Sequence, residues 1–343
     1  MPNTAKLGIT RKVILPVMLM VLTPIASFAA AATSLAAAAP PAGPEATSPE
    51  SLLQAGRVDD AMATLGKRLA VSGNDAEAHH LLSRAFFELG KWDAAIKESE
   101  RAVSLAPSNS SYHLWLGRAY GRKAEEVNPI SAARLAGKMR TQFEKAVELN
   151  GDDVGARTDL AEFYLEAPMI VGGGNDKARK QAEDIARHDA ATAHWIHARL
   201  AEKEKDFDAA EREYKTAIEQ SGNRADNWLS LASFYRRRAR LDEMEAAVQK
   251  AVNAEKRPSN IFFDAATLLY RAGYKLPQAA QFLGRYLSAK DKVEDAPAFR
   301  AHFLLGQILE KQGDKAAARK EYQAALALAK DYPDAREALR KLQ

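Results

Sequence analysis

A spacing of about 34 residues recurs along this chain and constrains its fold more than any other feature. Ala61 and Ala95 are 34 residues apart, as are Leu82 and Leu116. A fixed period in this range is typical of solenoids, in which similar supersecondary units stack on one another. The period therefore predicts the architecture and favours binding over catalysis. The same spacing separates Gly56 from Gly90, Phe86 from Tyr120, and Ala217 from Ala251.

Residues 76–109 form the clearest unit of this repeat. Helical spacing places Leu82 and Phe86 on one stripe, Gly90 interrupts the helix, and residues 93–103 form a second amphipathic helix. One such helix pair cannot bury its apolar face alone, so several units must stack to give a stable core.

Two short motifs, one from the first helix of a unit and one from the second, occur in separate places along the chain. Residues 115–120 read Trp-Leu-Gly-Arg-Ala-Tyr, which suits the first helix of a unit. This pattern resembles the tetratricopeptide repeat family. The resemblance implies an all-α fold, a right-handed α-solenoid of stacked helix-turn-helix repeats. The second motif follows Leu305 and Gly306, at Gly313, Ala318, Tyr322 and Ala325.

The resemblance extends over residues 49–343, which divide into about eight repeats. The first is partial, and the last is followed by a helix over residues 334–342. That helix is rich in Arg and Lys, so we expect it to cap the end of the stack with a polar face.

Three interruptions break the register. Tyr120 and Tyr164 are 44 residues apart, which is ten too many. The surplus lies near residues 125–137 and predicts either longer helices or a loop beside the groove. Further breaks fall at residues 166–176 and 290–297.

The second interruption contains a glycine triplet. Pro168 predicts the end of the preceding helix, and Gly172–Gly174 allow backbone conformations that other residues avoid. A phosphate-binding loop needs Gly-Lys-Ser/Thr after a strand, and no hydroxyl follows Lys177. We therefore favour a structural turn, with a partner-binding loop as the alternative. Asn175 or Asp176 is expected to cap the next helix.

Two further motifs have both a chemical and a structural interpretation. His194 and His197 are three apart and could share a metal ion, but His197 occupies the packing position that Leu82 and Leu116 fill elsewhere. Residues 235–240 contain four arginines that could bind phosphates, yet nearby acidic residues favour a solvated face. The sequence therefore indicates no metal, no cofactor and no nucleic-acid partner.

The first 30 residues have the features of a bacterial-type export signal. A positive start precedes an apolar stretch over residues 13–28 and small residues at 27–31. We expect a periplasmic or secreted protein, with residues 31–48 as an Ala/Pro-rich linker. The alternative is that the segment stays uncleaved and anchors the protein to the inner membrane, the one case in which a membrane partner is expected. The positive residues are Lys6, Arg11 and Lys12.

Composition limits the classes of function. The net charge is +4, and removing the three cations of the leader reduces it to +1. A nearly neutral protein gives no reason to expect nucleic-acid binding. The absence of cysteine excludes disulfides, thiolate metal sites and a thiol nucleophile.

The family resemblance also indicates where a partner would bind. In tetratricopeptide repeat proteins, the first helices of successive units line a concave groove that takes extended peptides. By register, the partner-binding residues are Arg84, Phe87, Arg118, Arg122, Trp195, Arg199, Arg236, Arg237 and Arg271. The same register adds His80, Leu114, Thr158, Glu162, Leu229, Ser233, Asp264, Leu268, Phe303 and Gln307.

Several of these arginines follow an apolar or aromatic residue by four positions. Leu114 precedes Arg118, and Trp195 precedes Arg199. Such pairs suit an acidic or C-terminal peptide, because charge-assisted hydrogen bonds lie beside apolar contact. The alternative, that the arginines pair with carboxylates of the groove itself, stays open. Those carboxylates are Glu162, Glu202 and Asp264.

The resemblance does not extend to binding of chaperone tails. Family members with that function use a Lys/Asn carboxylate clamp, and this chain has Arg84, Arg118, Arg199 and Ser233 at the corresponding places. The sequence thus predicts a non-enzymatic protein–protein interaction scaffold of the cell envelope. One alternative is an assembly component of an envelope, pilus or polysaccharide-export machine. The other is an enzyme, for which no nucleophile–base arrangement is found.

Overall fold

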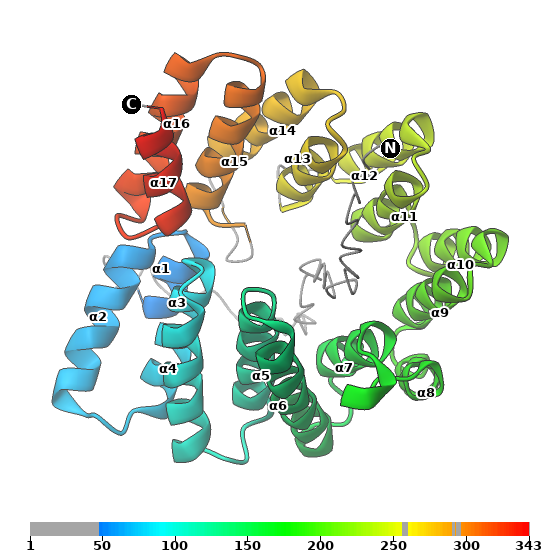
Figure 1. Cartoon of the computed structure of the whole chain (residues 1–343), viewed down its shortest axis with the longest axis horizontal. Coiled ribbons are helices and arrows are strands. Elements are labelled where there is room, and N and C mark those ends of the chain that lie inside the picture. Colours follow the sequence, from blue (N-terminus) through cyan, green and yellow to red (C-terminus); the bar gives the residue numbers. More distant parts are fainter. Residues whose placement is uncertain (1–47, 256–259, 290–291, 293–295, 343) are drawn as a thin grey trace, which may run out of the picture.

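The computed structural model describes residues 48–255, 260–289, 292 and 296–342, and all regular structure in these ranges is helical (Figure 1). The helices follow one another in pairs. The first helices of the pairs are α1 (Pro49–Gln54), α3 (Ala76–Glu88), α5 (Ser110–Ala124), α7 (Val154–Glu166), α9 (Ala190–Glu204), α11 (Ala225–Arg237), α13 (Asn260–Ala272) and α15 (Ala298–Lys311). The second helices are α2 (Val58–Val71), α4 (Trp92–Leu105), α6 (Pro129–Leu149), α8 (Asn175–Ile185), α10 (Phe207–Gln220), α12 (Leu241–Ala254), α14 (Leu276–Ser288) and α16 (Lys315–Leu328).

A helix α17 (Pro333–Lys341) follows the last pair, and a 3₁₀ turn η1 (Met169–Val171) lies between α7 and α8. The all-α solenoid predicted from the period is confirmed. The predicted signal peptide, and the predicted linker up to residue 47, lie outside the described residues.

Within a pair, a glycine in the first helix admits an aromatic ring from the second. A Cβ atom on Gly117 would lie 2.4 Å from the Phe143 ring, and one on Gly306 would lie 2.5 Å from the Tyr322 ring. Both rings are buried. Glycine costs a helix interior about 1 kcal/mol relative to alanine. Close packing of the two helices offsets that cost and explains why Leu-Gly recurs.

The helix ends also follow the repeat. The carboxylates of Asp75, Asp153 and Asp189 each accept a hydrogen bond from the backbone N–H three residues later, which fixes the start of a first helix. Gly56 and Gly90 follow first helices with φ angles of 72° and 70°, a left-handed conformation that favours glycine. The sequence period is therefore visible in the backbone.

The first two interruptions of the register have different structural outcomes. The ten surplus residues lengthen a helix, since α6 has 21 residues and α4 has 14. At the second, a Cβ atom on Gly173 would lie 1.8 Å from the Ala167 carbonyl oxygen, so the triplet is a tight turn that requires glycine. The expectation that Asn175 or Asp176 caps α8 was wrong: the cap is Gly174, without a side-chain hydrogen bond. Most of the third interruption, residues 290, 291 and 293–295, lies outside the described ranges.

The solenoid curves until its two ends meet, and the described helices form a ring (Figure 1). The first helices of the pairs lie on its inner face, which is clearest for α7 and α9 beside α8 and α10, and α17 lies where the two ends meet. One apolar core runs from α5 to α15. A second core joins the N-terminal helices to α15–α17, with Leu52 and Leu65 in the same cluster as Phe299, Tyr332 and Ala335.

Polar contacts reinforce this junction, which we call the seam. Arg300 forms an ion pair of 3.0 Å with Glu88. Lys91 lies 3.4 Å from Asp331. The backbones also approach closely, because a Cβ atom on Gly56 would lie 2.9 Å from the Ala298 nitrogen. Helix α17 therefore ends the stack next to the N-terminal helices, and its small Ala335 is fully buried there.

Candidate functional site: a groove on the inner face

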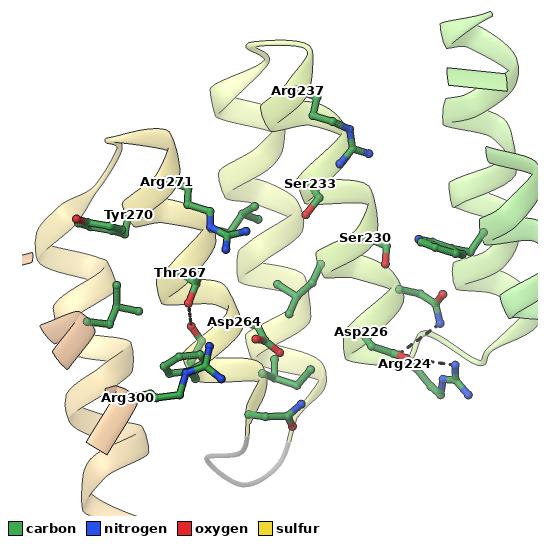
Figure 2. Close-up of a pocket in the computed structure, with 18 of the residues that line it drawn as sticks. Arg224, Asp226, Ser230, Ser233, Arg237, Asp264, Thr267, Tyr270, Arg271 and Arg300 are labelled. Atoms are coloured by element: carbon green, nitrogen blue, oxygen red, sulfur yellow. Dashed lines mark hydrogen bonds and ion pairs between the residues drawn. The ribbon is translucent and has the colours of Figure 1, made fainter. Parts of the chain in front are cut away.

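A groove of about 430 Å³ lies on the inner face of the ring, over α9, α11, α13 and α15 (Figure 2). Its apolar surface comes from successive first helices, which the repeat brings side by side. Trp195 contributes from α9, Leu229 from α11, Phe263 and Leu268 from α13, and Phe303 from α15. An apolar cleft of this kind can hold side chains of an extended peptide.

Polar groups stand between these apolar side chains. The hydroxyls of Ser230 and Ser233 and the amides of Asn227 and Gln307 line the groove. The Thr267 hydroxyl donates to the Phe263 carbonyl at 2.8 Å, so it is already engaged. The Asn227 Nδ2 likewise donates to the Asp226 carboxylate at 3.4 Å. Ser230, Ser233 and Gln307 provide donors and acceptors that can match a peptide backbone.

Three inner-face arginines form ion pairs with carboxylates of the preceding or following repeat. Arg118 Nε lies 2.6 Å from Asp159, on α7. Arg199 lies 2.5 Å from Glu166 of α7, and Arg237 lies 2.6 Å from Glu202 of α9. These pairs link α5, α7, α9 and α11 in sequence, and we call this stretch the paired arc.

Glu202 is the most heavily used carboxylate of the paired arc. It accepts two hydrogen bonds from Arg237, at 2.6 and 2.8 Å, and one from the Tyr214 hydroxyl at 2.6 Å. Burial raises the pKa of Glu202, but the hydrogen bond and charge of Arg237 outweigh it, so the pKa lies below its ordinary value. Glu202 therefore stays charged and holds two repeats together.

Glu162, on the same face of α7, is buried without an ion pair within the described residues. Burial and the neighbouring Asp159 raise the pKa of Glu162 to about 8, although Arg199 and Arg118 oppose this. Of the carboxylates in the open alternative, Glu202 therefore does pair with groove arginines, whereas Glu162 forms no ion pair within the described residues.

The remaining predicted residues of the N-terminal half form an aromatic stack of their own. The guanidinium groups of Arg84 and Arg118 each lie 5.1 Å from the Trp115 ring. Phe87 contacts Trp115 edge-on, with ring centroids 5.5 Å apart. Arg122 lies 4.9 Å from the Trp92 ring and 2.8 Å from Glu125. These contacts stabilise the second and third repeats.

The structure thus divides the predicted partner-binding residues into two sets. Four of them line the groove: Trp195, Arg199, Arg237 and Arg271. Six more register positions line it as well: Leu229, Ser233, Asp264, Leu268, Phe303 and Gln307. Those outside the groove are Arg84, Phe87, Arg118, Arg122 and Arg236, together with His80, Leu114, Thr158 and Glu162.

Sequence reasoning missed groove residues that lie one helical turn earlier. Ser230 comes three positions before Ser233, and Thr267 four positions before Arg271. Extending the register by one turn would have found both. Arg300 and Tyr332 were also missed, because they reach the groove only where the last repeat meets the seam.

The two other motifs show ordinary contacts. His194 Nδ1 lies 2.7 Å from a Glu213 carboxylate oxygen, and no group of three potential metal ligands occurs in the part of the chain that the structure describes. The arginines of residues 235–240 diverge: Arg240 pairs with Glu211, and Arg238 lies 3.6 Å from the Phe207 ring.

Two family models match the chain, one described as TPR repeat at residues 84–123 and one as Tetratricopeptide repeat at residues 299–332. No curated protein matches it. Among solved structures, yeast Tom70 is 15% identical, with a TM-score of 0.51. The match covers 83% of this chain and 58% of Tom70, so the chain spans just over half of that protein's length. This likeness concerns the fold alone.

Two bacterial structures are more distant by TM-score. A tetratricopeptide repeat protein from Parabacteroides merdae is 14% identical, with a TM-score of 0.42, and the match covers 86% of this chain and 95% of that one. A thermophilic TPR protein from Thermus thermophilus is 20% identical, with a TM-score of 0.44, over 52% of this chain and 91% of that one.

Proposed function

Because the chain is a tetratricopeptide repeat protein, we propose that it binds a protein or peptide partner in the groove over α9–α15, without catalysis. The groove itself is the observation that carries this proposal. It joins four repeats, apolar side chains from each of them contribute to its lining, and the lining also contains hydroxyls and amides. An extended segment can use all three features at once.

The absence of cysteine allows a sharp test of the groove. A single Ser233→Cys substitution gives a unique thiol on the groove lining, which a bulky maleimide can block. Ser104→Cys is the matched control, because Ser104 is exposed on α4 and outside the groove. Peptides selected from a displayed random library on the full-length wild type serve as ligands.

We expect blocked Ser233→Cys to lose binding of the selected peptides and blocked Ser104→Cys to retain it. Unchanged binding after both modifications would contradict the groove as the binding site. Equal loss after both would show that the modification disturbs the fold, which a thermal melt of each blocked protein detects.

We further propose that the protein acts in the cell envelope after export through residues 1–30. The leader-like composition of that segment supports this proposal. Within the described residues, no helix has both the length and the apolar character that crossing a bilayer requires. N-terminal sequencing of the mature protein tests the proposal: a start near residue 30 supports export with cleavage, and an intact Met1 supports the anchored alternative.

A further inference from the structure

Two arginines on the inner face differ from those of the paired arc. Arg236 lies in the last turn of α11, and Arg271 lies in the last turn of the neighbouring α13. Neither has an ion pair within 4 Å among the described residues. The Nε atom of Arg236 is buried and has no hydrogen-bond partner in the described part of the chain. Arg236 as a whole is only partly buried and Arg271 is exposed, so an anion can reach both side chains, and it would find a buried donor without a partner at the Arg236 Nε.

Other cations surround these two. Arg271 extends from α13 toward α11, on the side where Ser233 lies, and Arg300 extends from α15 toward α13 (Figure 2). Burial and the charges of Arg122 and Arg300 lower the pKa of Arg271, although Asp264 and Glu125 oppose this. Burial and the charges of Arg237 and Arg271 lower the pKa of Arg236. Positive charge therefore accumulates at the groove edge.

We propose that Arg236 and Arg271 form an anion subsite that binds a carboxylate side chain of an acidic peptide segment. The apolar side chains next to that carboxylate then contact Leu268 and Phe303 of the groove lining. This inference rests on the proposed function, because it assigns the chemistry of a partner that enters the same groove.

The surrounding charges favour an acidic peptide over a polyanion. Arg118, Arg199 and Arg237 are already bound to carboxylates, so no continuous strip of free cations follows the inner face within the described ranges. Nucleic acid needs several phosphate contacts in a row. The groove lining also carries the carboxylates of Asp226, Asp264 and Asp334, which repel a run of phosphates. Two guanidinium groups without an ion pair, next to apolar side chains, match one or two carboxylates with apolar neighbours.

The test compares two pools of fluorescent ten-residue peptides, acetylated at the N-terminus and amidated at the C-terminus. Each peptide has random apolar and small residues around one fixed position, which is Glu in the first pool and Gln in the second. Binding to the full chain is followed by anisotropy. We expect the Glu pool to bind wild type about tenfold tighter than the Gln pool, because a carboxylate forms charge-assisted hydrogen bonds with the arginines and an amide does not. In Arg271→Gln and in Arg236→Gln this preference falls to about twofold or less, with binding of the Gln pool unchanged.

Arg179→Gln is the matched control, since Arg179 is a partly exposed arginine of α8 outside the groove, and it should retain the full preference. Equal binding of both pools to wild type, with both blocked at maleimide-treated Ser233→Cys, would overturn the anion subsite and leave the proposed function standing. Binding of both pools that survives this block would contradict the proposed function itself. Competition by a twelve-residue oligothymidine, lost in Arg271→Gln, would reassign the subsite to nucleic acid and also overturn the inference.

Discussion

Arginine is used differently in two neighbouring parts of the inner face. In the paired arc, Arg118, Arg199 and Arg237 are each bound to a carboxylate of an adjacent repeat. At the groove edge, Arg236 and Arg271 have no such partner within the described ranges. The comparison teaches that residue type and helix position do not define a role. A cation that links repeats serves the fold, and one left without a carboxylate is available to a partner.

The largest effect is expected in the paired arc, from Glu202→Ala. This change removes the acceptor of Arg237 and of the Tyr214 hydroxyl and leaves a guanidinium without its carboxylate. We expect a loss of about 3 kcal/mol in the free energy of unfolding, measured by urea titration. Glu204→Ala, which removes an exposed carboxylate of the same helix, is the control and should cost about 0.5 kcal/mol or less. Equal losses in the free energy of unfolding for Glu202→Ala and Glu204→Ala would refute the special role of the carboxylates in the paired arc.

A smaller effect is expected from Arg118→Gln. The substitution leaves Asp159, whose side chain is 8% exposed, without the cation that lies 2.6 Å away. It also removes one of the two guanidinium groups beside Trp115. We expect a loss of about 2 kcal/mol in the urea titration. A change within about 0.5 kcal/mol would mean that the ion pair contributes nothing beyond an exposed one.

Glu162→Gln sharpens the comparison through pH. The pKa of Glu162 is about 8 in the folded protein and 4.5 for an ordinary Glu. Folding therefore favours the protonated form, so wild-type stability is complete below about pH 4.5 and falls as the pH rises to about 8. Glutamine does not titrate, so the Glu162→Gln variant does not lose stability in this way as the pH rises. We expect equal stability of wild type and variant at pH 4.5, and a variant more stable by about 1 kcal/mol or more at pH 9. Parallel pH profiles of the two proteins would contradict the buried, uncharged Glu162.

The smallest stability effect is expected at the groove edge. Arg271→Gln leaves no ion-paired carboxylate behind, so its free energy of unfolding should lie within about 0.5 kcal/mol of wild type. Thermal melts of Arg271→Gln and Arg118→Gln, run side by side, check this directly. A loss at Arg271 as large as that at Arg118 would place both arginines in the same structural role.

Much of the fold follows from local sequence. The 34-residue period, the Leu-Gly step at Gly117 and the turn at Gly90 all depend on contacts within one helix pair. The register also identified Trp195 and Arg271 as groove residues, since neighbouring first helices share one geometry. The predicted export signal stays a prediction, because residues 1–47 lie outside the described ranges.

Closure of the ring was not predictable in the same way. Arg300 and Glu88 are 212 residues apart, and they meet only because small rotations between successive repeats accumulate around the ring. The sequence pattern also could not predict which arginines of the register lie in the groove. Arg84, Arg118 and Arg122 occupy groove positions of the repeat, yet they lie against the rings of Trp115 and Trp92. Ion pairs and ring contacts decide which register positions stay available.

Amide hydrogen exchange tests the central claim most directly, with the tightest-binding member of the Glu peptide pool added to the full chain. We predict slower exchange in residues 225–237 and 260–272, which are α11 and α13, and no change in residues 110–124 and 154–166, which are α5 and α7. Protection confined to α5 and α7, or spread over the outer helices, would contradict the assignment of partner binding to the groove, with Arg271 in its lining and Arg236 beside it.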